Sequence, residues 1–152
     1  LGDYGIWGKY TLYEQSVKSP LIIRMPNDKY TGIHSEAIVE TVDIYPTIAQ
    51  LCGLNYPDDL DGESFSKTVT NPLITAREYA YSVVPRNSAI GHTLRSDRYR
   101  FMQWIDRETG DEILYELYDH KNDPAESKNI AKDHPDLVNG FAIQIENVKT
   151  NP

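Results

Sequence analysis

The chain has 152 residues, a formal net charge of −8 and a pI of about 4.9. Hydrophobic residues make up 39%, enough for a folded core, and no apolar run approaches the roughly 20 residues of a membrane span. The basic residues are scattered, which disfavours nucleic-acid binding, although one local cationic pocket can still bind an anionic substrate. Cys52 is the only cysteine, which excludes an internal disulfide and a cysteine-based zinc site.

The first part of the chain predicts little regular structure. Residues 1–18 predict an irregular, glycine-rich loop that leads into a short helix, and residues 20–25 are an apolar run typical of a buried strand. A helix is predicted to start near residues 41–43 and to run to Leu51, where Gly53 can supply a left-handed cap. One strand and one helix cannot complete a doubly wound sheet, so we expect these residues to finish a larger α/β core.

The turn-rich residues 55–72 form the predicted boundary between two parts of the chain. Beyond them, alternating apolar and polar residues predict strands over 77–84, 92–95, 99–105 and 113–118. A last helix is predicted over Asp136–Lys149. We therefore divide the chain into residues 1–72, the end of an α/β domain, and residues 73–152, an antiparallel sheet of three or four strands packed by a terminal helix.

Four motifs follow one another along nearly the whole chain. They are LGDYGIWGK at residues 1–9 with Tyr13-Glu14 and PLII at 20–23, VDIYPT at 42–47, LDGESF at 60–65, and LYD at 117–119 with NDP at 122–124 and Glu126. In order and spacing they resemble the C-terminal portion of the type I sulfatases, a family of the alkaline-phosphatase-like superfamily. Together with AYS at 80–82 and GHTLRS at 91–96, the first motif resembles most closely the iduronate-2-sulfatase branch.

The resemblance implies an α/β sulfatase fold and the hydrolysis of sulfate esters. Such enzymes use a formylglycine, made from the cysteine or serine of a C/S-x-P/A-S/T-x-R motif, and a divalent metal, usually calcium. No such motif occurs here, because the residues around Cys52 fail every other position. The family's Asp-His metal pair should lie before Leu1, and Asp3 lies downstream of it. We therefore predict no metal ligand and no bound cofactor in this chain alone.

The resemblance also implies partners and a location. The nucleophile and the metal would come from an N-terminal sulfatase region or chain, which would be the partner of this one. The substrate would be a sulfated carbohydrate, either uronate-2-sulfate in glycosaminoglycans or a sulfated algal polysaccharide. We expect no nucleic acid and no membrane as partners. Members of the family are periplasmic, secreted or lysosomal.

Lys9 is the active-site residue that the resemblance carries over, because the family's lysine at this position contacts the sulfate. An ammonium can stabilise the negative charge that develops on the sulfuryl and leaving oxygens. His92 and Arg95 are predicted to recognise a sugar or its carboxylate, and Trp7 to stack on a sugar ring. Without the resemblance, a lysine beside glycines is usually solvated, His92 is equally a backbone-bonded strand residue, and Arg95 belongs in a surface ion pair.

The sequence is also compatible with two other hypotheses about function. A phosphate or phosphonate ester hydrolase of the same superfamily would share the surroundings of Lys9 but use a threonine or an unmodified cysteine upstream. A non-catalytic carbohydrate-binding or structural module is a third reading, against which an exposed half-sheet argues. His34, His120 and His134 receive no role. Asp119 and Asp123 resemble part of a calcium loop without the full EF-hand spacing, so we predict a turn there.

Overall fold

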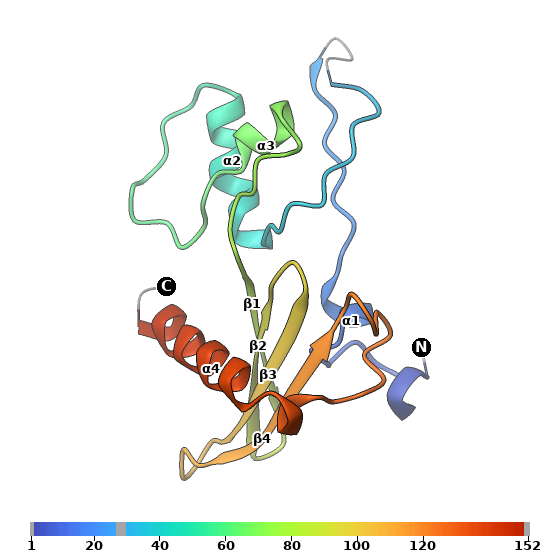
Figure 1. The fold of residues 1–152 in the computed structure, drawn as a ribbon. Helices are drawn as coiled ribbons and strands as arrows, with labels where there is room; N and C mark the ends of the chain where they lie inside the picture. The colour runs from blue at the N-terminus through green and yellow to red at the C-terminus, as the bar shows by residue number, and fades with distance from the viewer. Residues whose placement is uncertain (1, 27–29, 151–152) are drawn as a thin grey trace. The chain divides into compact units, whose positions relative to one another are not determined.

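The structure, a computed structural model, describes residues 2–26 and 30–150, apart from the side chain of Asp3. Leu1, the first residue of the LGDYG motif, lies outside the described residues. The chain divides into two compact units, which we name the sheet unit (1–19 with 81–152) and the helical unit (20–80) (Figure 1). The predicted division at residue 72 concerns the domains of a larger enzyme and stays a prediction.

The sheet unit is built on a sheet of four strands in the described part of the chain. The strands are β1 (Ala80–Arg86), β2 (Ala89–Arg95), β3 (Tyr99–Asp106) and β4 (Glu112–Asp119). They lie in the order β1-β2-β3-β4, and both β2 with β3 and β3 with β4 pair antiparallel. The predicted antiparallel sheet is confirmed, because alternation along a strand directs every second side chain to the same face.

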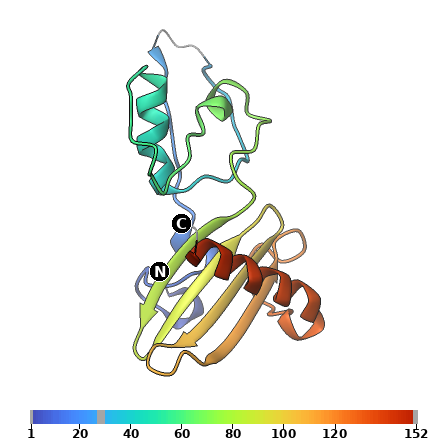
Figure 2. The same cartoon turned by 90° about the vertical axis from the view of Figure 1, so that its left-hand side faces the viewer.

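The two faces of this sheet carry different layers (Figure 2). One face is covered by the terminal helix α4 (Pro135–Thr150), which buries Phe141 and Ile145. The ring of Phe141 stacks on that of Phe101 from β3, with 5.6 Å between the ring centroids. The predicted helix is confirmed with one more residue at each end. No helix in the described ranges is long and apolar enough to cross a bilayer.

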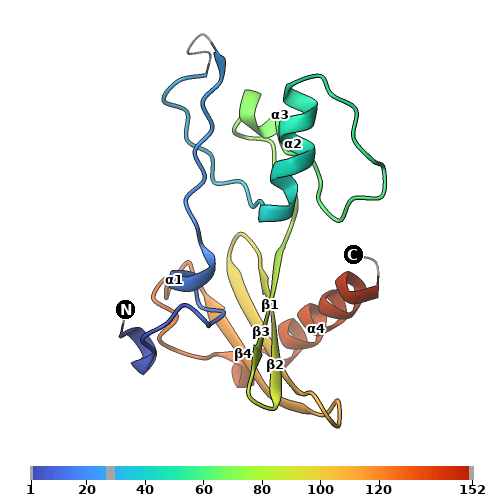
Figure 3. The same cartoon turned by 180° about the vertical axis from the view of Figure 1, so that it is seen from behind.

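The opposite face of the sheet is covered by the N-terminal segment, residues 2–19, which includes the short helix α1 (Glu14–Val17) (Figure 3). Leu12 is 2% exposed and packs in a cluster with Val84 of β1 and Met102 of β3. Trp104 packs against the same cluster. This segment is thus one layer of a three-layer unit, although its sequence predicts mostly loop.

The helical unit holds η3 (Thr41–Asp43), α2 (Ile44–Leu51) and α3 (Ser66–Thr70). The predicted helix from residues 41–43 to Leu51 is confirmed, and Gly53 after it has a φ of 67°. Only glycine adopts that left-handed conformation without steric cost, which is why the helix ends there.

Two of the sequence motifs meet inside the helical unit. Asp43, from VDIYPT, is fully buried, and its Oδ1 accepts a hydrogen bond from the backbone N–H of Glu63 at 2.9 Å. Thr47 accepts one from the N–H of Phe65 at 3.0 Å. Gly62 approaches the Val42 carbonyl so closely that a side chain would collide with it. The VDIYPT and LDGESF motifs therefore stabilise each other. This structural role accounts for their residues without any catalytic role.

Arg77 balances the charge of this buried motif. Its guanidinium donates to Glu40 Oε2 at 2.5 Å and to Asp43 Oδ1. Glu40 and Asp43 also form a reciprocal capping box at the start of η3. A buried carboxylate needs such a cation and such donors, because desolvation otherwise penalises the ion.

The strand predicted over residues 20–25 is wrong. These residues have no regular structure, and Leu21, Ile22 and Ile23 are 43%, 91% and 40% exposed. A strand forms only where a neighbouring strand pairs with its N–H and C=O groups. In its described residues, the helical unit contains no strand to do so.

We expect Gly62→Ala to destabilise the protein. The new Cβ would lie 2.2 Å from the Val42 carbonyl oxygen, so the backbone of one of the two motifs must shift. The expected loss is about 1–3 kcal/mol of unfolding free energy, measured by denaturant titration. Gly140→Ala in α4 is the control, because its Cβ would meet nothing within 4 Å and should add about 1 kcal/mol through helix propensity. Equal unfolding free energies for the two variants would contradict the predicted collision.

Candidate functional site

The segment that carries Lys9 runs between the 3-10 helix η1 (Asp3–Gly5) and α1. Lys9 is exposed, and Trp7 is 81% exposed. Gly5 has a φ of 70°, which suits the tight turn that precedes them. The side chains of Lys9 and Trp7 therefore point away from the core of the sheet unit and are available to contact a ligand or another part of the protein.

Contacts on both sides of Lys9 hold this exposed segment on the sheet. Before it, the ring of Tyr4 stacks on that of Tyr13 at 4.0 Å, and the Tyr4 hydroxyl donates to the Ala125 carbonyl. After it, Leu12 is buried against the sheet in the cluster with Val84 and Met102. The loop of Lys9 is thus short and tethered at each end, so the position of the ammonium depends on these anchors.

A buried ion-pair network supplies the strongest of the anchors. Arg100 of β3 is 1% exposed, and its Nε donates to Glu126 Oε1 at 2.5 Å. Its Nη2 donates to Glu14 Oε2, and the backbone N–H of Glu14 donates to Glu126 Oε2 at 2.8 Å. One guanidinium and one backbone N–H thereby join α1, the inner strand β3 and the loop after β4.

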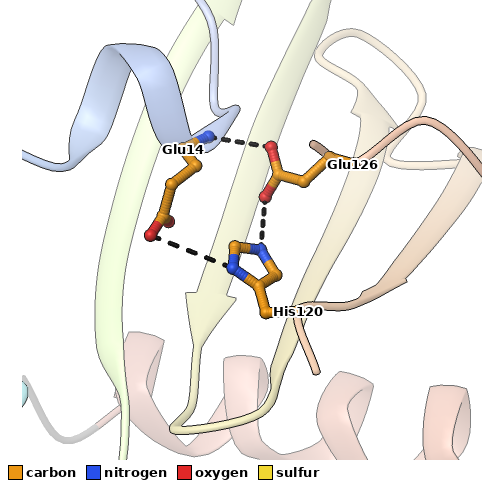
Figure 4. A group of neighbouring side chains, drawn as sticks. All are labelled: Glu14, His120 and Glu126. Atoms are coloured by element: carbon orange, nitrogen blue, oxygen red, sulfur yellow. Dashed lines mark hydrogen bonds and ion pairs between the residues drawn. The ribbon is translucent and has the colours of Figure 1, made fainter. Parts of the chain in front are cut away.

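His120 and Arg95 complete the network. Figure 4 shows His120 between the two carboxylates, with Nε2 at 2.8 Å from Glu126 Oε1 and Nδ1 at 3.9 Å from Glu14 Oε1. Arg95 of β2 donates through Nε to Glu14 Oε2 at 3.2 Å. Two carboxylates therefore face two guanidiniums and one imidazole, which balances the buried charge.

The network also shifts the pKa of Glu14 and fixes an unusual backbone conformation at Glu126. Burial raises the pKa of Glu14, but Arg100 and Arg95 lower it by more, so the net pKa lies below the ordinary value. Glu126 has a φ of 55°, a conformation that costs a side-chain-bearing residue about 1–2 kcal/mol. Such a conformation persists only where the surroundings over-determine it, and here Arg100, His120 and the N–H of Glu14 do so.

Glu14, His120 and Glu126 could in principle hold a metal ion, since one ligand atom of each lies within 4.8 Å of the others. The donor set does not fit the calcium that the family resemblance implies. Calcium takes six to eight oxygen ligands, whereas the carboxylate oxygens here already accept hydrogen bonds from Arg100, Arg95 and a backbone N–H. The arrangement is that of a structural ion-pair network.

A second buried carboxylate, Glu116 of β4, lies on the same face and fixes the other side of the segment. It accepts hydrogen bonds from Tyr13 at 3.0 Å, from Tyr118 at 2.5 Å and from Trp104 Nε1 at 2.9 Å. Burial and the nearby carboxylate raise the pKa of Tyr13 to about 12. The indole of Trp104 is thereby committed to packing against the cluster of Leu12 and to its hydrogen bond with Glu116.

The structure separates the two residues predicted to recognise the sugar. His92 is 6% exposed and bonds through Nδ1 to the Tyr81 hydroxyl at 2.6 Å. Burial lowers its pKa, and so does Lys149 of α4, so His92 faces the helix layer. Arg95, three residues on, faces Glu14 and the N-terminal segment. They lie on opposite faces of β2, so no single small ligand contacts both.

Asp119 and Asp123 form the predicted turn. Asp119 accepts the N–H of Lys121 at 3.1 Å and a bidentate pair from Arg98, and Asp123 accepts the N–H of Lys128 at 2.8 Å. Their pKa values are both lowered, that of Asp119 by the Arg98 hydrogen bonds first and that of Asp123 by backbone N–H groups. Carboxylates used in this way organise the loop that carries Glu126.

Comparisons with known proteins identify relatives among the sulfatases. Residues 2–150 match the family described as N-sulphoglucosamine sulphohydrolase, C-terminal. The chain is 31% identical over 156 residues to an N-acetylgalactosamine-6-O-sulfatase of Bacteroides thetaiotaomicron, covering 94% of this chain and 29% of that protein. It is 27% identical over 157 residues to arylsulfatase K of Homo sapiens, covering 95% of this chain and 28% of that one.

The fold has solved counterparts as well. One is the structure of a protein in complex with its substrate D-glucosamine-2-N,6-O-disulfate, with a TM-score of 0.61 and 25% identity. The match covers 77% of this chain and 26% of that one. The chain spans less than a third of each of these three relatives.

We expect Arg100→Met to cost about 3–5 kcal/mol of unfolding free energy, because it leaves Glu126 buried without its cation. Denaturant titration measures the loss. The control is Lys149→Gln, which removes an exposed pair with Glu146 and should change the unfolding free energy by less than about 1 kcal/mol. Similar losses for the two variants would show that the network does not support the fold.

Acid should lower the unfolding free energy of the protein, partly through protonation of Glu14. Its pKa is lower in the folded state than the ordinary 4.5, so the unfolded chain takes up the proton first as the pH falls. Stability from this group is present above about pH 4.5 and is lost progressively below it. We expect Glu14→Gln to show a smaller decrease of unfolding free energy between pH 5 and pH 3 than the unmodified protein. Parallel decreases would contradict the assignment.

Proposed function

The chain belongs to the N-sulphoglucosamine sulphohydrolase C-terminal family, and on this premise we propose that it supplies the C-terminal region of a sulfatase acting on sulfated sugars. The observation that carries the proposal is the family match over residues 2–150. The names of the relatives agree with it, since they include hexosamine 6-O-sulfatases and an ulvan-active sulfatase.

The motif resemblance implies a narrower substrate class than the names of the relatives do. The LGDYG and GHTLRS motifs resemble the iduronate-2-sulfatase branch, which would imply a uronate-2-sulfate. The relatives include enzymes named for the 6-O-sulfates of N-acetylgalactosamine and N-acetylglucosamine. We propose a sulfated sugar of a polysaccharide as the substrate, with uronate-2-sulfate and hexosamine-6-sulfate as the two candidates to be compared.

Lys9 is the residue of this chain to which we assign a catalytic role. It is exposed on a loop that Tyr4 and Leu12 anchor on either side. Hydrolysis of a sulfate ester increases the negative charge on the sulfuryl oxygens and on the leaving oxygen. A positioned ammonium with three N–H donors stabilises that charge, and it acts most strongly when its position needs no rearrangement. Trp7, on the same loop, is then placed to pack against the sugar.

The remaining machinery belongs, in this proposal, to the larger part of the protein that the relatives contain beyond this region. The family resemblance implies a formylglycine nucleophile and a divalent metal, usually calcium. In the described part of this chain, the cluster of Glu14, His120 and Glu126 does not fit calcium. The same resemblance suggests a periplasmic, secreted or lysosomal location.

The test is sulfate release by the whole protein that contains this chain. We expect release from a sugar 2-sulfate or 6-sulfate, and we expect Lys9→Ala to lower kcat about 10²–10³-fold, as removal of a charge-stabilising donor does. Lys132→Ala, an exposed lysine of η4 (Ala131–Asp133), is the control and should keep full activity.

The panel should include the matching sugar phosphates. Phosphate release without sulfate release would favour the phosphate or phosphonate ester hydrolase instead. Full activity of Lys9→Ala on the sulfated sugar would remove Lys9 from the reaction while leaving the sulfatase assignment in place.

A further inference from the structure

A pocket of about 580 Å³ opens in the sheet unit beside the ion-pair network. Its lining includes four cationic side chains, Lys18, Arg95, Arg98 and Lys121, and two carboxylates, Glu14 and Asp97. The chain as a whole carries a net charge of −8. Cations therefore gather in this pocket against the general charge of the protein. A volume of this size is within the usual range of about 300–1,000 Å³ for ligand pockets.

The four cations come from three parts of the unit. Lys18 follows α1, Arg95 ends β2, Arg98 lies between β2 and β3, and Lys121 lies in the loop after β4. Like charges brought together repel one another. Glu14 offsets Arg95 and Asp119 offsets Arg98, so the charge that a bound anion would offset is mainly that of Lys18 and Lys121.

The charge of one of the two carboxylates, Glu14, is already balanced by guanidiniums. Glu14 accepts hydrogen bonds from Arg95 and from the buried Arg100, and Arg100 is not part of the pocket lining. The charge of Glu14 is thus countered inside the network and contributes little negative potential to the pocket. His120, which also lines the pocket, bonds to Glu126 on its far side.

Arg98 is held ready for an anion. Its Nε and Nη2 donate to the two oxygens of Asp119 at 2.9 Å and 2.7 Å. This bidentate pair fixes the plane of the guanidinium, and a guanidinium has five N–H groups, so donors remain for a ligand. The side chain is 46% exposed, which leaves it accessible from the pocket.

The two lysines have no comparable structural duty. Lys18 is 71% exposed and forms one long ion pair with Glu14 at 3.6 Å. Lys121 is exposed as well. Flexible ammonium groups beside guanidiniums that are fixed by carboxylates form an arrangement that suits an oxyanion.

We propose that this pocket binds an oxyanion group, a sulfate or a carboxylate, of a sulfated oligosaccharide, at a place other than the sulfate that Lys9 contacts. The choice of a sugar as the carrier of the anion rests on the proposed function. Arg98 and Arg95 supply fixed donors, and Lys18 and Lys121 supply mobile charge. A free sulfate ion has the same chemistry and is the other source of such a group.

The test uses the double variant Lys18→Gln/Lys121→Gln in the whole protein. Its matched control is Lys128→Gln/Lys132→Gln, which removes two exposed lysines that do not line the pocket and leaves the same net charge. All proteins carry Lys9→Ala, so that the sugar is not consumed. Calorimetric titration then measures the Kd of a defined sulfated tetrasaccharide, its unsulfated counterpart and inorganic sulfate at two salt concentrations.

We expect the pocket variant to bind the sulfated tetrasaccharide about tenfold more weakly than the control, as loss of contacts to charged groups does. The unsulfated sugar should show no such difference if the pocket takes a sulfate, and the same difference if it takes a carboxylate that the unsulfated sugar retains. Equal Kd values for the pocket variant and the control would overturn the proposal. A loss confined to inorganic sulfate would overturn the sugar and assign the pocket to the free ion.

Sulfate release is measured separately, in proteins that retain Lys9. This second measurement distinguishes failure of the pocket proposal from failure of the proposed function. A protein that released no sulfate from any sugar but bound the tetrasaccharide with the predicted difference would refute the activity and support the pocket. Because all four lysines are exposed, the variants should fold, and equal unfolding free energies check that they do.

Discussion

The sheet unit depends on the buried guanidinium of Arg100. It lies between two carboxylates that are distant in the chain, Glu14 and Glu126, separated from it by 86 and 26 residues. Any of the three alone would be an unpaired charge in the core. The free-energy penalty of burying such a charge is larger than the stabilisation that most single contacts in a protein provide. Satisfying all three requires α1, β3 and the loop after β4 to meet at one point. The path of residues 2–19 over the sheet follows from that requirement.

This constraint links distant motifs of the sequence to one another. Glu14 belongs to the Tyr-Glu pair after LGDYG, and Glu126 ends the motif that begins with Leu117-Tyr118-Asp119. In the helical unit Asp43 and Gly62 join two further motifs in a similar way. Several motif residues therefore hold other motif residues. Lys9 and Trp7 instead lie exposed on a loop that is anchored at both ends, so their side chains remain available for a ligand.

Much of the fold followed from local pattern, whereas the site did not. Alternation in β2 to β4 and the apolar spacing of α4 predicted the sheet and the terminal helix, because both patterns follow from the local geometry of the backbone. The strand predicted over 20–25 was wrong, since a short apolar run guarantees neither burial nor a neighbouring strand to pair with. Lys9 was reached only by resemblance. The network could not be predicted because its pairs span up to 112 residues, although Arg100, a charge among the apolar residues of β3, signalled a buried partner.

The same geometry decides which predicted sugar contacts can act together. Arg95 faces the N-terminal layer and the cationic pocket, while His92 lies under α4 and bonds to Tyr81. A strand presents successive side chains to opposite faces, so residues three apart point in opposite directions. A saccharide bound at Arg95 is therefore out of reach of His92. In the proposed function, recognition by this region therefore belongs to the side of the sheet where the N-terminal segment lies, which is also the side that carries Lys9.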